Sequence, residues 1–197
     1  MYRAVAWAAV SRGVAVEDEP GVTALAEVLR IEILEPTTDD GRHYTVLVDG
    51  QDVTWNLRQK AVELAVSPVS EYRGVRHAMT VQQRRIAERG RIVMVGRDIG
   101  TVVLPKAELK IYLDASLDVR ARRRHLEMLE RDPATTYQAA LDSVLQRDLK
   151  DSQRSEAPLK PAVDAIVIDS TNLSIRQVLG MVLAIIENGP WNIPDGG

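Results

Sequence analysis

The chain has 197 residues, of which 45% are hydrophobic, enough for one domain with a buried core and a modest insertion. It carries 28 acidic and 25 basic residues, and the net charge of -3 excludes binding to nucleic acid or anionic lipid driven by the overall field, so any anion site must be local. The absence of cysteine excludes disulfides, thiolate nucleophiles and zinc-thiolate sites, and the three histidines, His43, His77 and His125, lie too far apart in sequence to indicate a metal cluster.

Residues 1–12 are rich in alanine and predict an amphipathic helix. The apolar run 4–10 comes after Arg3 as in a secretory signal, but it has the minimum length for one, and the charged Arg12 interrupts the apolar character just beyond it. The longest other apolar run, residues 178–186, is far shorter than the ~20 residues needed to span a bilayer. We therefore expect a cytoplasmic protein.

A small antiparallel ribbon is predicted after a second helix, which starts at Pro20 and ends near Leu29. Residues 30–35 and 43–48 alternate apolar with polar side chains, and a turn at residues 37–42 joins them. The alternation indicates a sheet with one face in solvent. Because the later apolar runs lack it, we expect the ribbon to be an insertion that spans about residues 30–55.

The pattern over residues 56–89 is helical, with a predicted break near Ser67 and Pro68. The break is expected because proline disfavours helix in the residue before it. Ser67 is therefore expected in an irregular segment.

A run of four apolar residues, 92–95, predicts a buried strand that leads into Gly96, Arg97 and Asp98. Open α/β sheets bind their ligands at the carboxyl ends of the strands, so this loop is a candidate site. On these residues alone, a plain strand followed by a polar turn explains the pattern equally well.

The rest of the chain alternates strands with helices. Strands are predicted over residues 109–113 and 165–168, and helices over residues 116–131, 135–154 and from Ser174 to about residue 187. Ser174 and Gln177 form a capping-box signature. The alternation indicates an α/β fold, with a parallel sheet that has helices on both faces. Three strands of this sheet are visible in the sequence. The tail, residues 188–197, is expected to be disordered.

Arg120, Arg123 and Arg124 share one face of the helix over residues 116–131. A solvated helix is the commoner explanation for such a run. However, the segment from Ser116 to Arg124 contains four arginines and no lysine, and planar guanidinium groups suit forked recognition of phosphate. Nucleic-acid binding by this helix is disfavoured by the negative net charge and by the lack of an aromatic stacking platform.

Arg147, Asp151 and Arg154 are separated by four and three residues, so they share a face of the next helix. One interpretation is a surface ladder of ion pairs, worth about 0.2–0.5 kcal/mol each. The other is a pair of guanidinium groups that bind phosphate, with a carboxylate that orients one arginine or accepts from a sugar hydroxyl. The residues alone leave both interpretations open.

Asp98 and Arg97, with Ser67 and Arg76 upstream, have the chemistry needed to recognise a base. A carboxylate can accept from the exocyclic amino group of cytosine, and an arginine can donate to its ring acceptors. Uracil reverses this pattern, so such a pocket is expected to prefer cytosine. The chain has no Gly-x-x-x-x-Gly-Lys-Ser/Thr loop, and residues 96–100 cannot replace it because they lack the lysine and the spacing.

Several segments occur in an order typical of one enzyme family. They are Met1-Tyr-Arg-Ala-Val-Ala6, Gly96-Arg-Asp-Ile-Gly-Thr-Val-Val-Leu-Pro105, Leu113-Asp-Ala-Ser116, Arg120-Ala-Arg-Arg-Arg124, Arg147-Asp-x-x-Asp-x-x-Arg154, Ala157-Pro-Leu159 and Asp169-Ser-Thr-Asn-Leu-Ser174. Together they resemble bacterial cytidylate kinase, the (d)CMP kinase family, from Met1 to about Glu187, including the inserted ribbon.

The resemblance implies a P-loop nucleoside monophosphate kinase fold, with a five-stranded parallel core in one domain over residues 1–187 and a helical lid at about residues 115–157. It also implies transfer of the ATP γ-phosphoryl group to CMP or dCMP, giving CDP or dCDP in pyrimidine nucleotide metabolism, with Mg²⁺ and as a monomer. Phosphoryl transfer depends on positioning and on cations more than on a protein nucleophile, which agrees with the arginine-rich pattern.

The resemblance also implies which residues contact the acceptor nucleotide. Those that match Ser67, Arg76 and Asp98 read the cytosine, and those that match Arg147 and Asp151 lie near the pentose.

The phosphates are assigned to arginines in the same way. Those that match Arg3, Arg97 and Arg154 hold the acceptor phosphate. The lid arginines that neutralise charge on the transferring group are Arg120, Arg123 and Arg124.

One departure from the family is large. Its members begin with a strand, the phosphate-binding glycine loop with its lysine, a helix and a second short strand, just before the Tyr-Arg pair seen at Tyr2 and Arg3. We therefore expect a fragment, or a start codon assigned too late, and a chain that is inactive and unstable as written. The alternative is a genuine short chain that binds a cytidine nucleotide or a partner protein without catalysis.

Overall fold

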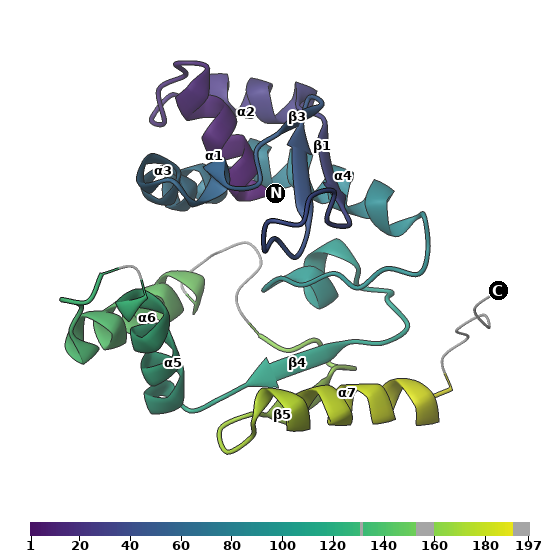
Figure 1. Cartoon of the computed structure of the whole chain (residues 1–197). Helices are drawn as coiled ribbons and strands as arrows, with labels where there is room; N and C mark the ends of the chain where they lie inside the picture. The colour runs from purple at the N-terminus through teal and green to yellow at the C-terminus, as the bar shows by residue number, and fades with distance from the viewer. Residues whose placement is uncertain (131, 153–159, 191–197) are drawn as a thin grey trace. The chain divides into compact units, whose positions relative to one another are not determined.

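The computed structural model describes residues 1–130, 132–152 and 160–190, without the side chains of residues 150–152. The chain divides into two compact units, Met1–Gly90 and Arg91–Gly197. The architecture is mixed α/β, with a three-stranded antiparallel sheet in the first unit and a two-stranded parallel sheet in the second (Figure 1). None of the helices in the described residues combines the length and the apolar composition of a membrane span.

The first unit is built on a buried helix. Its elements are α1 (Tyr2–Ser11), α2 (Glu19–Val28), β1 (Ile31–Leu34), β2 (Thr45–Val48), β3 (Gln51–Asp52), the short η1 (Asn56–Arg58), α3 (Lys60–Glu71) and α4 (Arg73–Ala87). The predicted helices at residues 1–12 and 20–29 are thereby confirmed. All residues from Ala4 to Ala9 are buried, and the alanines among them let α2 and α3 approach α1 closely.

Pro68 lies inside α3, so the predicted break near Ser67 and Pro68 is wrong. Proline removes one helical hydrogen bond, but Ala65 and Val69 on either side of it are buried in the core, and this burial offsets the loss. The chain turns instead at Tyr72, whose extended backbone (φ -64°, ψ 124°) separates α3 from α4. Ser67 therefore lies in a regular helix.

The predicted antiparallel ribbon is confirmed. β1 pairs with β2, with Ile31 opposite Val48 and Leu34 opposite Thr45. β2 then turns through Asp49 and Gly50 into β3; the two turn residues have φ values of 50° and 83°, as a type I′ hairpin turn requires. The ribbon residues that join the core of the first unit are Ile31, Val46, Val48 and Val53.

Arg42, in the loop between β1 and β2, is the charged centre of the ribbon. Its side chain is only 7% exposed; Nε and Nη2 donate to the two oxygens of Asp40 (2.7 and 2.6 Å), and Nη1 donates to Oδ2 of Asp52 (2.5 Å). Thr54 also donates to Asp52, at 2.6 Å. The bonds from Thr54 and Arg42 lower the pKa of Asp52 to about 2, and those from Arg42 and Trp55 hold the pKa of Asp40 well below its usual range.

The second unit contains the parallel strands and the arginine-rich helix. Its elements are the π-helical turn η2 (Ile99–Val103), β4 (Ile111–Asp114), α5 (Leu117–Leu129), α6 (Tyr137–Ser152), β5 (Ile166–Asp169) and α7 (Ile175–Asn188). β4 and β5 pair in parallel with Asp114 opposite Asp169, which confirms the parallel arrangement of these two runs. Both strands therefore end at the same edge of the sheet.

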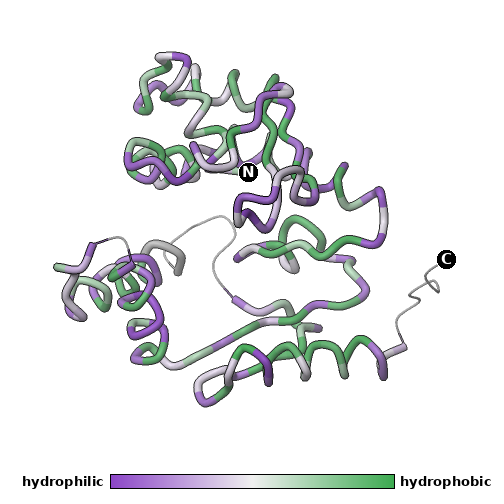
Figure 2. Tube along the Cα trace, in the orientation of Figure 1, coloured by the Kyte–Doolittle hydropathy of each residue, from purple (hydrophilic) through white to green (hydrophobic). Residues whose placement is uncertain are grey.

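Three helices accompany these strands along the chain, α5 and α6 between β4 and β5, and α7 after β5. α5 packs against α6, and α7 begins with the predicted capping box between Ser174 and Gln177. α7 is apolar along most of its length (Figure 2), yet none of its residues is fully buried, and Ile175 is 89% exposed. Of the tail predicted to be disordered, residues 191–197 lie outside the described residues.

Residues 92–95 do not form the predicted buried strand. They pair with no strand in the described part of the chain, and Val93 and Val95 are 88% and 91% exposed. An apolar run becomes a buried strand only where a neighbouring strand pairs with its backbone and other elements cover its side chains. Among the described residues the parallel sheet therefore has two strands, and not the predicted three.

We predict that Arg42→Gln lowers the melting temperature by about 5 °C at pH 7, because two carboxylates lose their cation. The pKa values of Asp40 and Asp52 are depressed in the folded chain. Their hydrogen bonds and ion pairs therefore contribute their full stabilisation above about pH 4, and this contribution decreases as the pH falls through about 2 and below.

Thermal unfolding of the wild type and of Arg42→Gln over this pH range is the measurement, and the two melting temperatures should converge in acid. Arg30→Gln, which removes only the pair between a 75% exposed Arg30 and Glu32, is the matched control. A difference between the melting temperatures of the wild type and Arg42→Gln that does not shrink between about pH 4 and about pH 2 would contradict the ion-pair account.

Candidate functional site

The carboxyl edge of the β4–β5 sheet carries polar side chains from both strands. Asp114 and Asp169 are the last residues of the strands. Beyond β5, Oγ1 of Thr171 accepts from the backbone N–H of Ser116 (2.8 Å) and donates to Oδ1 of Asp169 (2.5 Å). These bonds fix the first turn of α5 at the edge where parallel sheets bind ligands.

Arg120 is held at this edge by α6. Its Nε donates to the carbonyl of Ala115, just after β4 (3.0 Å), and its Nη1 lies 2.9 and 2.7 Å from the two carboxylate oxygens of Asp148. The two side chains remain 36% and 35% exposed. Asp148 was not predicted as a site residue.

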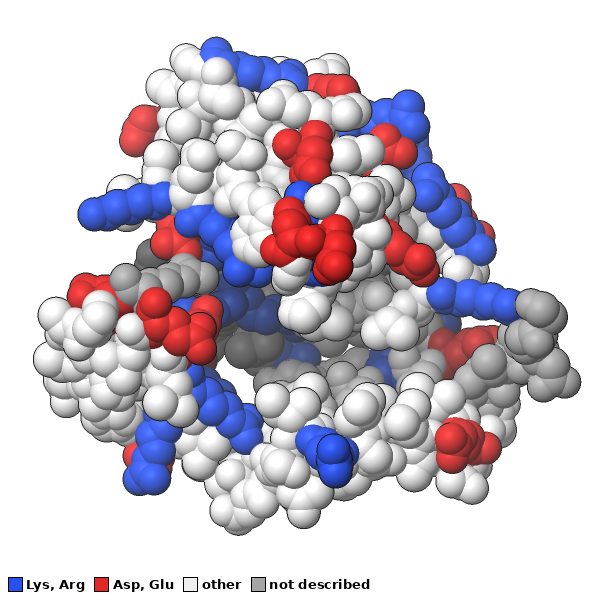
Figure 3. Space-filling view, viewed as in Figure 1, with Lys and Arg blue, Asp and Glu red and all other residues white. Residues whose placement is uncertain are grey.

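The other predicted lid arginines differ in their contacts. Arg123 is anchored after β5, where Nη1 donates to Oγ of Ser170 (3.0 Å) and Nη2 to its carbonyl (2.7 Å). Arg124 pairs with Glu127 on the same helix (2.9 Å). In the space-filling view, basic side chains project from the surface over α5 (Figure 3). Arg120 and Arg123 thus contact the ends of the strands, whereas the contact of Arg124 is a surface pair of small energetic value.

A hollow of about 1150 Å³ lies within the second unit. Its wall is largely apolar and includes residues 92–95, much of β4, and parts of α6 and α7. Charge in the wall comes from Arg97, Asp114, Arg120 and Asp148, with lysines at 110 and 160. An apolar hollow with a few convergent polar groups is the usual form of a small-molecule site, and this one is large enough for a nucleotide.

Arg97 and Asp98 lie in the bend that precedes η2. The carbonyl of Asp98 accepts from two N–H groups of η2 (2.9 and 3.2 Å), which winds the turn as a π-helix. A Cβ atom at Gly96 would lie 2.8 Å from Cγ1 of Ile99, so a larger residue here would have to displace the Ile99 side chain. Arg97 is exposed and Asp98 is half-buried.

Arg3, which was predicted to hold the acceptor phosphate, lies in the first turn of α1. Its Nη1 donates to the carbonyl of Leu57 (3.0 Å) and lies 3.7 Å from Oε1 of Glu63. The side chain is 44% exposed. The arginine is therefore oriented by contacts from η1 and α3 and still accessible to a ligand.

Arg76 and Ser67 lie on neighbouring helices of the first unit. The guanidinium of Arg76 lies over the ring of Tyr2, 6.0 Å from its centroid, and Nη1 donates to the carbonyl of Ser70 (3.4 Å). Oγ of Ser70 in turn donates to the carbonyl of Ser67 (2.8 Å). The first unit thus links α4, through Arg76, to the elements that carry Arg3 and Ser67.

The predicted face on α6 is only partly described. Arg147 is exposed, while the side chain of Asp151 and the whole of Arg154 lie outside the described residues. Asp148, the residue next to Arg147, makes the contact with α5.

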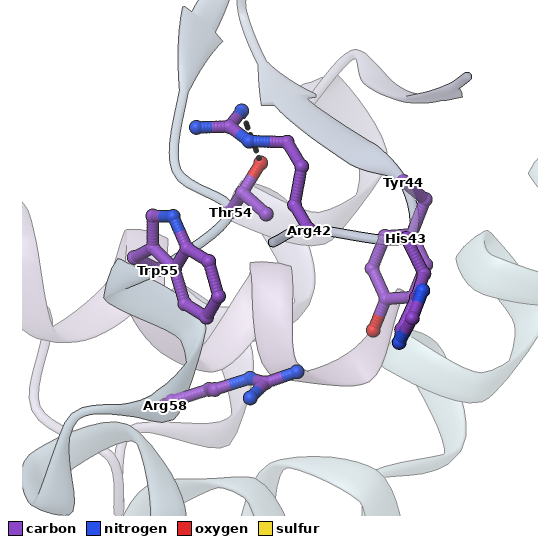
Figure 4. Close-up of a pocket in the computed structure, with 6 residues that line it drawn as sticks. All are labelled: Arg42, His43, Tyr44, Thr54, Trp55 and Arg58. Carbon is purple, nitrogen blue, oxygen red and sulfur yellow. Dashed lines mark hydrogen bonds between the residues drawn. The ribbon is translucent and has the colours of Figure 1, made fainter. Parts of the chain in front are cut away.

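The first unit has a much smaller hollow on the ribbon, with a volume of about 10 Å³ (Figure 4). The side chains that line it are Arg42, His43, Tyr44, Thr54, Trp55 and Arg58. The guanidinium of Arg58 stacks on the indole of Trp55, 5.0 Å from its centroid. This hollow has room for about one water molecule, and none of the predicted site residues lines it.

The described residues contain no group of three or more His, Asp or Glu side chains that could hold a metal ion. In phosphoryl-transfer sites Mg²⁺ is held by one or two carboxylates together with phosphate oxygens of the substrate. The described residues therefore do not form a magnesium site made of protein ligands alone.

Comparison with known proteins gives one consistent result. The cytidylate kinase family profile matches residues 1–188. A cytidylate kinase of Roseiflexus castenholzii is 49% identical over 189 residues, which cover 95% of this chain and 80% of that protein. A cytidylate kinase of Chloroflexus aggregans is 45% identical over 183 residues, which cover 93% of this chain and 78% of that protein. A cytidylate kinase of Bacillus velezensis is 40% identical over 187 residues, which cover 95% of this chain and 82% of that protein.

We predict that Thr171→Val raises the pKa of Asp169, because the hydrogen bond from the Thr171 hydroxyl is the largest cause of its lowered value. The carboxyl ¹³C shift of Asp169, followed against pH, measures this change. The pKa of Asp164, lowered by its bond from Lys110, should stay constant and is the internal control. An unchanged Asp169 pKa would contradict the network described at the sheet edge.

Proposed function

Since the chain belongs to the cytidylate kinase family, we propose that it acts in the transfer of the ATP γ-phosphoryl group to CMP or dCMP, with Mg²⁺ bound to the ATP phosphates. The observation that carries the proposal is the pair of arginines, Arg120 and Arg123, held at the carboxyl edge of a parallel sheet. This is the edge at which α/β folds bind nucleotides.

Phosphoryl transfer needs little covalent help from the protein. The transferring group carries charge on its equatorial oxygens, and the enzyme contributes alignment and positive charge. We assign neutralisation of the charge on the transferring group to Arg120, Arg123 and Arg124. These arginines lie on α5, and the α5–α6 hairpin is the proposed lid. Anchored guanidinium groups require little reorganisation when the charge develops, which favours Arg120 and Arg123 over Arg124.

We assign the acceptor nucleotide to the residues that match the motifs of the family. Its phosphate is assigned to Arg3, Arg97 and Arg154, and its pentose to Arg147 and Asp151. The half-buried carboxylate of Asp98 supports cytosine recognition, because a carboxylate accepts from the amino group that uracil lacks. The residues proposed to complete the base site are Ser67 and Arg76.

A second candidate function is binding of CMP without transfer. The observation that favours it is the absence from the 197 residues of a Gly-x-x-x-x-Gly-Lys-Ser/Thr loop, whose backbone N–H groups and lysine hold the ATP phosphates in P-loop kinases. On this alternative the chain, as a monomer, binds the acceptor and turns over slowly or not at all.

Nucleotide-dependent release of ADP from ATP tests the proposal, with CMP, dCMP, UMP and AMP as acceptors. We predict that kcat/KM for CMP or dCMP exceeds that for UMP by about 100-fold, since uracil would leave the polar groups of the pocket unpaired. Asp98→Asn should narrow this ratio, while Asp39→Asn, an exposed aspartate of the ribbon loop, is the control. Good turnover of UMP or AMP without turnover of CMP would overturn the assignment, whereas calorimetric binding of CMP without turnover would favour the second candidate.

A further inference from the structure

We propose that Asp148 is a positioning residue, which fixes the guanidinium of Arg120 so that its Nη2 group is presented to a phosphate in the hollow of the second unit. This inference rests on the proposed function, in which Arg120 binds the transferring phosphoryl group. It adds a residue that the motif pattern of α6 does not select.

The donor groups of Arg120 support this role. A guanidinium has five N–H donors, one on Nε and two on each terminal nitrogen. Nε donates to the Ala115 carbonyl, and Nη1 donates to both carboxylate oxygens of Asp148. No acceptor in the described part of the chain takes a hydrogen bond from Nη2, so its two donors remain for a ligand.

The location of the pair also favours a ligand-binding role. Arg120, Asp148 and Arg97 all line the hollow of about 1150 Å³. Arg120 is 36% exposed, which leaves it accessible to a bound anion. Its Nε contact lies just beyond β4, so the guanidinium is tied to the sheet edge on one side and to α6 on the other.

A purely structural role, as a staple between α5 and α6, explains less. Tyr137 donates to Asp118 (2.8 Å), and a ring nitrogen of His125 lies 2.9 Å from the carbonyl of Thr135, so the hairpin has other fastenings. A partly exposed ion pair adds little stability. A pair that served only to fasten the helices would gain most from a two-nitrogen fork, whereas here both oxygens of Asp148 meet a single nitrogen.

A blocking role, in which Asp148 competes with phosphate for Arg120, predicts the opposite experimental result. If the carboxylate competed, its removal would strengthen anion binding. If it positions the guanidinium, its removal frees the side chain to adopt other rotamers and weakens anion binding.

The test is titration of the full 197-residue chain with inorganic pyrophosphate, for the wild type, Asp148→Ala, Arg120→Ala and the double variant. We expect the dissociation constant to rise about 10-fold in each single variant, and the double variant to bind no more weakly than either. Asp148→Glu, which keeps the carboxylate, should recover part of the loss. Asp142→Ala, which removes an exposed carboxylate of α6 bonded to Gln138, should bind as the wild type does.

A spectroscopic signal separates positioning from a general loss of structure. The Nε–H resonance of Arg120 should be sharp in the wild type and in Asp142→Ala, and broadened or lost in Asp148→Ala, while the melting temperature falls by no more than about 4 °C. Tighter or unchanged pyrophosphate binding by Asp148→Ala, additive losses in the double variant, or a wild type that does not bind pyrophosphate would each overturn the inference.

Phosphorylation of CMP is measured on the same samples as a separate readout. A wild type that binds pyrophosphate as expected but does not phosphorylate CMP means that the proposed function fails while the positioning role stands. If the wild type phosphorylates CMP and Asp148→Ala binds pyrophosphate as tightly as the wild type does, the proposed function stands and the positioning role fails.

Discussion

The parallel pairing of β4 with β5 is the constraint on which the candidate site depends. The register that places Asp114 opposite Asp169 makes both strands end at the same level. Thr171 can then reach the backbone of Ser116 and start α5 at this edge, and Arg123 can reach Ser170. A slip of one residue would turn every side chain of a strand to the other face and break these contacts together.

The arginine contacts are thus a consequence of the backbone pairing. α5 projects from the end of β4, so its first two turns place Arg120 and Arg123 beside the residues that come after the strands. Arg124 points elsewhere on the same helix and pairs with Glu127. A shared helical face in the sequence therefore contains arginines with different surroundings, and the two that contact the sheet edge have the more defined orientation.

Local signals in the sequence predicted much of the fold. The Ser174 capping box and the alternation in the ribbon each act over a few residues, and both are confirmed. Pro68 was misjudged because the burial of α3 on both sides of it outweighs the local preference. Residues 92–95 were misjudged because an apolar run does not reveal whether a strand lies beside it.

The candidate site could be predicted only in part, because some of its contacts join elements that are far apart in the sequence. The arginines were found from composition and motif, and Ser170 and Thr171 come directly after a strand at an edge where ligands bind, so the sequence does point to them. Asp148 lies about 100° around α6 from Arg147, off the face that the spacing selects, and its role depends on the packing of α5 against α6. Contacts between helices far apart in sequence leave no periodic signal.

A crystal structure of the chain with CMP and a non-hydrolysable ATP analogue tests the central claim most directly. The account predicts that phosphate oxygens of the bound nucleotides contact the guanidinium groups of Arg120 and Arg123, with Asp148 still bonded to Nη1 of Arg120 and the cytosine against Asp98. Nucleotide phosphates bound away from the β4–β5 edge, with both arginines contacting only protein, would contradict it.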